Sequence, residues 1–206
     1  KKSILETDDY SLSRGKYLSN STNLNSDYPL KALKDICEIT MGQSPKSEFY
    51  NEIGKGLEFH QGKTNFGDIK LQPSGVWTSQ YNKVAEENSI LMSVRAPVGP
   101  VNITERKIAL GRGLSGIKTN KDCDQMYLFY LLQSSQEKLT KSSHGSTFDS
   151  INRNQLLDFE IPIPPIETQK KIVNELEGYQ SMIHGCRQVA ENYKPFIEID
   201  SSWNFY

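Results

Sequence analysis

The chain has 206 residues, of which 36% are hydrophobic and 24% charged, and its formal net charge is −1. This length is enough for one domain of ordinary size and an appendage. No apolar run approaches the roughly 18 residues of a membrane span, and the N-terminus lacks the apolar stretch of a signal peptide, so the sequence argues against a membrane protein and a secreted one.

The first 29 residues have the composition of a linker. They are rich in Ser and Asn and end in Asn25-Ser26-Asp27-Tyr28-Pro29. Such a segment is expected to become ordered only by docking on a neighbour. Because the sequence also lacks a starting Met, we expect it to be a piece of something longer.

From Leu30 the pattern is that of a mixed domain. Ser44 is predicted to cap a short helix with Pro45 at its first position. Gly-rich turns then alternate with short β-prone runs, which predicts an irregular, largely antiparallel sheet. The predicted strands are Leu57 to His60, Val76 to Thr78, Ser89 to Val94, Val101 to Thr104, and Leu114 to Lys118.

Two further elements complete this domain. Asp124 is the predicted N-cap of a buried helix that follows it, and we interpret the aromatic residues of that helix as core. From Leu157 to Ile163 apolar residues alternate with acidic residues and proline, which predicts a strand that ends the domain at Pro164-Pro165. The predicted fold class is therefore α+β, with a mainly antiparallel, β-rich domain over residues 30–165.

The last predicted element is a long helix over residues 166–194, beginning after Pro165 and ending before Pro195. Its apolar residues follow the 4-3-4-3 spacing of a coiled-coil seam. About 28 residues span roughly 42 Å, so we expect the helix to extend beyond its domain and pair with another helix. The alternative is an amphipathic helix that lies on its own domain. The seam residues are Ile172, Leu176, Tyr179, Ile183, Cys186, Ala190 and Tyr193.

Charge is unevenly distributed along the chain. Between Ser89 and Lys121 there are six basic residues and one acidic residue, a local excess of +5, whereas residues 166–206 carry four basic and six acidic residues. A basic face of this kind is what phosphate binding requires, although such an excess is also common on surfaces without a ligand.

Several short segments resemble, in the same order, those of Type I restriction-modification specificity subunits and of the related fused methyltransferase–specificity proteins. These segments are LKDICEITMGQSP (33–45), SVRAPVG (93–99), GRGL (111–114), GSTFDSI (145–151) and IPIPPIETQKKIV (161–173). The last is the most specific of them. The resemblance covers about residues 30–195 and implies a target recognition domain followed by a spacer helix.

Both flanks extend the resemblance. Residues 9–17 resemble the end of the family's adenine methyltransferase part, and residues 193–203 resemble the linker to a second recognition domain. The resemblance thus implies that residues 1–29 are a tail from a preceding methyltransferase part and that residues 195–206 lead toward a second recognition domain.

Motifs for catalysis are not found. The sequence has no Asn/Asp-Pro-Pro-aromatic tetrapeptide, with which amino-methyltransferases hold the flipped base, and no Gly-rich cofactor loop after a strand. A hydrolase built on His144 is disfavoured because no nucleophile elbow accompanies it. The three cysteines are widely spaced and suit a reducing cytosol, and the histidines fall at no metal-ligand spacing. We therefore expect a cytoplasmic protein with no catalytic residues, no cofactor and no metal.

The resemblance implies that the domain reads one half of a bipartite DNA target. Base contacts need exposed polar or basic side chains near Gly, with affinity coming from phosphate contacts. We expect Gln61 or Asn65 to contact adenine, and Lys63, Arg95 and Arg112 to contact guanine or phosphate. A plain polar hairpin at 60–67, and salt bridges for the two arginines, are the alternatives. The predicted DNA-binding residues are Gln61, Lys63, Asn65, Arg95, Arg112, Ser146 and Thr147.

The expected partners are double-stranded DNA, the adenine methyltransferase part or subunit, and a second spacer helix, so that this chain would form a homodimer. Two other functions are considered beside DNA recognition. One is an active methyltransferase or nuclease, which the missing motifs disfavour. The other is a protein–protein adaptor that acts through its C-terminal coiled coil.

Overall fold

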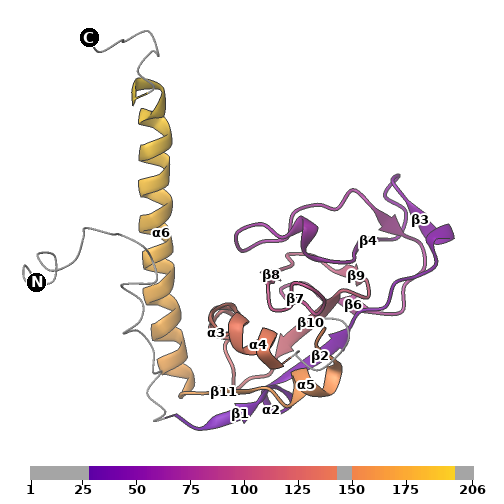
Figure 1. Ribbon diagram of the computed structural model, residues 1–206, viewed down its shortest axis with the longest axis horizontal. Helices are drawn as coiled ribbons and strands as arrows, with labels where there is room; N and C mark the ends of the chain where they lie inside the picture. Colours follow the sequence, from indigo (N-terminus) through magenta and orange to yellow (C-terminus); the bar gives the residue numbers. More distant parts are fainter. Residues whose placement is uncertain (1–27, 143–149, 198–206) are drawn as a thin grey trace, which may run out of the picture.

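The computed structural model describes residues 28–142 and 150–197, which form an α+β domain and one long C-terminal helix (Figure 1). The strands are β1 (Leu30–Ala32), β2 (Cys37–Met41), β3 (Tyr50–Asn51), β4 (Leu57–His60), β5 (Trp77–Thr78), β6 (Val84–Ala85), β7 (Ile90–Ser93), β8 (Val101–Ile103), β9 (Ile108–Leu110), β10 (Leu114–Thr119) and β11 (Glu160–Pro162). The helices are α2 (Leu33–Ile36), α3 (Gln125–Ser134), α4 (Gln136–Ser142), α5 (Arg153–Leu157) and α6 (Ile166–Ile197), with single 3-10 turns η1 (Ser47–Phe49) and η2 (Lys63–Asn65).

One four-stranded antiparallel sheet, in the order β2-β10-β7-β8, carries the main core. Its buried residues, Ile90, Met92 and Ile117 among them, pack together with Leu128 and Phe129 of α3. The Asp124 carboxylate accepts hydrogen bonds from the first backbone N–H groups of α3 at 2.9 and 3.0 Å, so the predicted N-cap and the core role of this helix are confirmed.

A second sheet, in the order β3-β5-β4-β9-β6, packs over a smaller cluster that includes Leu91, Leu110 and Leu114. Most of its pairs are antiparallel, but β4 and β9 run parallel, with Phe59 opposite Ala109. Parallel strands end at the same edge of a sheet. The loops that follow β4 and β9 therefore begin side by side, although 50 residues of sequence separate Phe59 from Ala109.

The five predicted strands between Leu57 and Lys118 each lie within two residues of an observed strand, but two other local predictions are wrong. Ser44 caps no helix, because η1 begins later, with Lys46 at its N-cap position. Leu157 is not the start of a strand but the end of α5, a helix that a capping box between Asn152 and Gln155 initiates. Only Glu160–Pro162 of the predicted alternation forms a strand.

Helix α6 extends away from the domain, as Figure 1 shows. Val173 is buried and Ile172 packs against the main core, whereas Tyr179, Met182 and Val189 are each more than half exposed. The helix continues past Pro195, so the predicted end before that residue is wrong. A proline so close to the helix end removes a single backbone hydrogen bond in the last turn.

The first turn of α6 is fastened to the domain by Gln169, whose side chain is fully buried. Its Oε1 accepts from the Asp124 N–H at 2.8 Å, and its Nε2 donates to the carbonyls of Asp122 at 3.1 Å and Pro164 at 2.8 Å. Every hydrogen-bonding direction of the amide except one acceptor lone pair is thus used. No helix among the described residues is both long and apolar enough to span a membrane.

Candidate nucleic-acid interface

The candidate site lies where the loops after β4 and β9 meet. The N–H of Gly111 donates to the carbonyl of His60 at 2.7 Å, and that of Gly113 donates to the carbonyl of Gln61 at 3.0 Å. Two main-chain hydrogen bonds therefore attach the turn that carries Arg112 to the segment that carries Gln61.

Glycine is required at this junction because the backbones approach too closely for any side chain. A Cβ on Gly113 would lie 2.3 Å from the Gln61 carbonyl oxygen, and one on Gly42 would lie 2.1 Å from that of Gly111. The Gly42 N–H also donates to the Leu114 carbonyl at 2.8 Å. The segment after β2 therefore packs on the turn that carries Arg112. Two of the short glycine motifs found in the sequence thus pack on each other.

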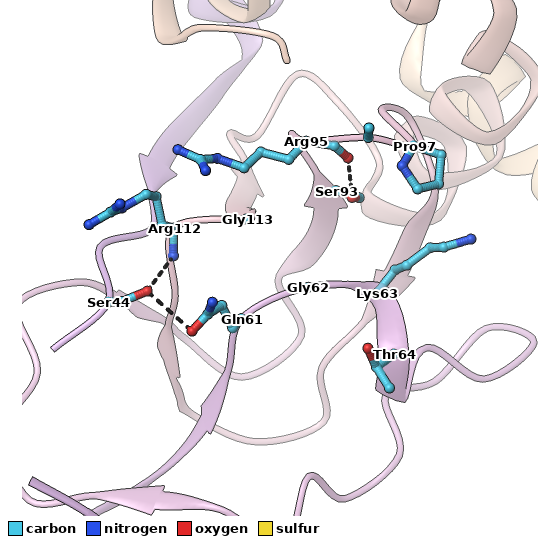
Figure 2. A pocket seen from close by; sticks show the side chains of 11 residues that line it. Ser44, Gln61, Gly62, Lys63, Thr64, Ser93, Arg95, Pro97, Arg112 and Gly113 are labelled. Atoms are coloured by element: carbon cyan, nitrogen blue, oxygen red, sulfur yellow. Dashed lines mark hydrogen bonds between the residues drawn. The ribbon is translucent and has the colours of Figure 1, made fainter. Parts of the chain in front are cut away.

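These loops and the one after β7 enclose a pocket of about 530 Å³ (Figure 2). Its walls combine residues from segments far apart in the chain: Ser44, Gln61, Gly62, Lys63, Thr64, Ser93, Arg95, Ala96, Pro97, Arg112 and Gly113. Four residues predicted to bind DNA, Gln61, Lys63, Arg95 and Arg112, are brought together here. In Figure 2 the two arginines extend toward one side of the view and Lys63 toward the other.

The pocket is positively charged and its cations are unpaired. Lys63, Arg95 and Arg112 are exposed, no carboxylate belongs to the lining, and none of the three forms a salt bridge among residues 28–142 and 150–197. The alternative of salt-bridged arginines is therefore wrong for the described part of the chain. By contrast, Arg106 pairs with Glu58, outside the pocket.

The other predicted contacts do not line this pocket. The Asn65 amide donates to the Pro73 carbonyl at 3.0 Å, which fastens the loop that follows η2. Ser146 and Thr147, together with His144, lie outside the described residues.

Sequence reasoning missed the role of two serines in the pocket. The Ser44 hydroxyl accepts from the Arg112 N–H at 3.1 Å and donates to Gln61 Oε1 at 3.4 Å. Ser93 Oγ donates to the Arg95 carbonyl at 3.0 Å, which ties down the loop before the cis Ala96–Pro97 peptide. Both serines belong to the segments 33–45 and 93–99, which carried the family resemblance and could have identified them.

Close to the pocket, Glu58 and His60 of β4 are buried beside Arg106. Burial by itself would raise the pKa of the Glu58 carboxyl, but hydrogen bonds from Arg106 and from the Ser74 N–H outweigh it and hold the pKa below its ordinary value. Burial lowers the pKa of His60, so this imidazole is neutral at pH 7. His60 Nε2 lies 3.3 Å from Glu58 Oε1 without forming a well-aligned hydrogen bond. These groups hold β4 in place and do not open into the pocket.

The predicted helix-pairing residues separate into two groups. Ile172 and Leu176 are half-buried near the domain, so the start of the predicted seam is partly used by the chain itself. Beyond them the helix is exposed, and the side chain of Tyr193 lies outside the described ones. The exposed apolar surface of α6 comprises Tyr179, Met182, Ile183, Cys186, Val189 and Ala190.

Met182 and Val189 were not in the predicted seam, so the exposed apolar face is broader than the sequence spacing indicated. With Gly185, Cys186 and Ala190 they line a shallow, mainly apolar depression. Among the described residues, no group of three or more His, Cys, Asp or Glu could hold a metal ion.

Known proteins resemble this chain over most of its length. The family model of the type I restriction modification DNA specificity domain matches residues 25–189. A putative specificity subunit of the type I restriction enzyme MjaX of Methanocaldococcus jannaschii is 42% identical over 155 residues, which are 75% of this chain and 36% of that protein. The MjaIX specificity subunit of the same organism is 25% identical over 86% of this chain and 44% of its own length.

Solved structures give the same result. A chain from a type I R-M system has a TM-score of 0.75 and 34% identity, over 86% of this chain and 44% of its own length. The HsdS subunit from Thermoanaerobacter tengcongensis has a TM-score of 0.71 and 34% identity, over 83% of this chain and 42% of that one. The chain thus spans less than half the length of each of these relatives.

Proposed function

The chain belongs to the family of type I restriction modification DNA specificity domains, and on that premise we propose that it recognises one half of a bipartite DNA target. In this proposal it directs an adenine methyltransferase, and a restriction subunit where the system has one, to that target without carrying catalytic residues of its own. One of the similar solved structures describes the complex assembly of a type I R-M system, and this similarity supports a role of the chain within a larger complex.

The observation that carries the proposal is the set of unpaired cations in the pocket. Lys63, Arg95 and Arg112 are exposed and have no acidic partner within residues 28–142 and 150–197, although Glu residues neutralise Arg106 and Lys107 nearby. Cations that the fold leaves free can neutralise DNA phosphates and release counterions. The polar side chains beside them can contact base edges in the major groove.

The proposal includes pairing of α6 with a second helix of the same kind. Tyr179, Met182, Ile183 and Val189 are each 46–59% exposed on a helix that extends away from its domain. Full burial of one such apolar side chain contributes roughly 1.5–3 kcal/mol. In this chain alone, the simplest closed arrangement is a two-fold homodimer, in which two recognition domains lie at opposite ends of an antiparallel helix pair.

Binding to duplex DNA at increasing salt tests the proposal, with the full chain and fluorescence-labelled DNA. We expect dissociation constants of about 10⁻⁴ to 10⁻⁶ M that weaken as salt rises. Lys63→Ala and Arg112→Ala should each weaken binding, because each removes one exposed cation of the pocket. Lys171→Ala, which removes an exposed charge on α6, is the matched control and should change binding little.

The result also decides between DNA recognition and the adaptor function. An adaptor that acts only through α6 would bind no duplex at any salt concentration, and its self-association would be unaffected by both pocket variants. Affinity that does not change with salt would contradict the electrostatic basis of the proposal.

A further inference from the structure

Three main-chain carbonyls around the pocket already accept a hydrogen bond from within the protein. The carbonyl of Gln61 accepts from the Gly113 N–H at 3.0 Å, and that of Gly113 accepts from the Val94 N–H at 3.0 Å. The Arg95 carbonyl accepts from the Ser93 hydroxyl at 3.0 Å. The same hydrogen bonds that fix the loops therefore occupy one lone pair of each of these three carbonyls, which reduces the acceptor capacity that the pocket offers to a ligand.

The side chains of Ser44 and Gln61 are likewise engaged with each other. The Ser44 hydroxyl accepts from the Arg112 N–H and donates to Gln61 Oε1, and Figure 2 shows both bonds meeting at Ser44. This contact orients the Gln61 amide with its oxygen toward Ser44. Its Nε2 makes no hydrogen bond with any described residue, so it remains available as a donor.

The charged groups left for a ligand are all donors. They are the Lys63 ammonium and the guanidinium groups of Arg95 and Arg112, and the Gln61 Nε2 donor lies beside them. The uncharged Thr64 hydroxyl can donate or accept, and no carboxylate among the lining residues offers an acceptor. A complementary ligand must present acceptors. In duplex DNA these are the phosphate oxygens and the acceptor atoms of the base edges.

Among the major-groove edges, guanine alone offers two acceptors, O6 and N7, without a donor. Adenine and cytosine each present an amino group, which needs an acceptor from the protein, and thymine combines one acceptor with a methyl group. A glutamine that reads adenine in the usual bidentate way accepts from N6 through its Oε1. In this pocket, that oxygen is directed to Ser44.

The geometry points to the pocket of Gln61, Lys63, Arg95 and Arg112 as a guanine-reading subsite. Ser44 is the positioning residue, because it holds the Oε1 acceptor that adenine requires and leaves the Gln61 Nε2 donor for the ligand. This inference rests on the proposed function and names the base that its DNA target presents. It replaces the expectation that Gln61 contacts adenine. A phosphate would satisfy the same donors, so the experiment must distinguish a contact to the guanine base from a contact to the phosphate backbone.

Analogues that lack N7 make this separation without changing the backbone. The full chain is titrated at low salt with a guanine-rich duplex and with the same duplex containing 7-deazaguanine. We expect about two- to tenfold weaker binding to the analogue, because one of the two contacts of a bidentate pair is lost. An adenine–thymine duplex with and without 7-deazaadenine is the matched control and should bind equally in both forms.

Variants assign the effect to the proposed groups. Gln61→Glu, which replaces the donor by an acceptor, should remove the preference for guanine over 7-deazaguanine. Gln80→Glu adds the same charge at an exposed position outside the pocket and should preserve the preference. Ser44→Ala frees the Gln61 amide to rotate and should make binding sensitive to 7-deazaadenine.

Equal affinity of the unmodified chain for the guanine and 7-deazaguanine duplexes would overturn the inference and leave the cations as phosphate contacts. Such binding would still weaken with salt, so the proposed function would stand. Only if the chain bound none of the duplexes would the proposed function itself be contradicted.

Discussion

Replacing Gln169 by leucine tests how the long helix is attached to its domain. The Gln169 amide satisfies the N–H of Asp124 and the carbonyls of Asp122 and Pro164, and leucine keeps the approximate volume but supplies no hydrogen bond. Pro164 is buried and Asp124 is half-buried, whereas Asp122 is exposed and water can solvate its carbonyl. The substitution therefore leaves two backbone groups with poor access to a new partner.

A buried polar group that loses its partner costs about 1–3 kcal/mol. At about 2 kcal/mol for each of two groups, Gln169→Leu should lower the free energy of unfolding by about 4 kcal/mol. For a chain of this size, each 1 kcal/mol shifts the melting temperature by about 2–4 °C, so we expect a decrease of about 8–16 °C. Because Asp124 also caps α3, a shift of its backbone should increase this loss of stability further.

Thermal unfolding followed by circular dichroism at one fixed protein concentration measures the effect. Gln180→Leu, at an exposed position on the same helix, is the matched control and should change stability by less than about 0.5 kcal/mol. Gln169→Glu should destabilise at pH 7, because it keeps an acceptor for Asp124 but places a carboxylate against two carbonyls, and acidification should restore part of the loss. If the Gln169→Leu protein had the same melting temperature as the unmodified chain, the attachment of α6 through this residue would be refuted.

Three further outcomes are expected. In sedimentation experiments the chain should run as a dimer, and Ile183→Asp should convert it to a folded monomer. Ser181→Asp, at an exposed polar position on α6, should leave it dimeric. An unmodified chain that runs as a monomer would contradict the helix pairing. Because burial lowers the pKa of His60 in the folded state, its contribution to stability is complete above the unfolded value of 6.5 and is lost as the pH falls through the folded pKa. The melting temperature should therefore fall on acidification below about pH 6.5, and His60→Gln should reduce that dependence. Gly113→Ala should cost about 1–3 kcal/mol of stability because its Cβ would meet the Gln61 carbonyl, whereas Arg112→Ala should leave the melting temperature unchanged.

The sequence predicted elements best where a local period exists. Strands β4, β7, β8 and β10 are apolar runs bounded by turn residues, and the structure places them within two residues of the prediction. Strands β3 and β6 have two residues each, which is too short for any period to appear. Asn152 and Gln155 did carry a local signal, a capping box, whereas the alternation that begins at Leu157 suggested a strand instead.

The site shows a different limit. Gln61, Lys63, Arg95 and Arg112 were identified because each is a polar or basic residue beside glycine or after an apolar run. That they line one pocket depends on the parallel pairing of β4 with β9, a long-range contact that residue spacing does not encode. Ser44 was misassigned for a related reason: Ser-Pro also begins helices, and the partner of its hydroxyl is distant in sequence.

The way the pocket is built has a consequence for the residues that line it. Gln61 and Arg112 are held by hydrogen bonds between main-chain atoms, and the close approach that makes these bonds possible depends on Gly42, Gly111 and Gly113. The side chains at positions 61 and 112 project into the pocket and contribute no packing to the core. Under the proposed function, substitutions there alter which base edge is contacted at little cost in stability, whereas a side chain at Gly113 would meet the Gln61 carbonyl. On the same proposal, substitutions at positions 61 and 112 change the DNA preference of the domain, while the glycines keep the close approach of the loops after β4 and β9 and the attachment of α6 is unaffected.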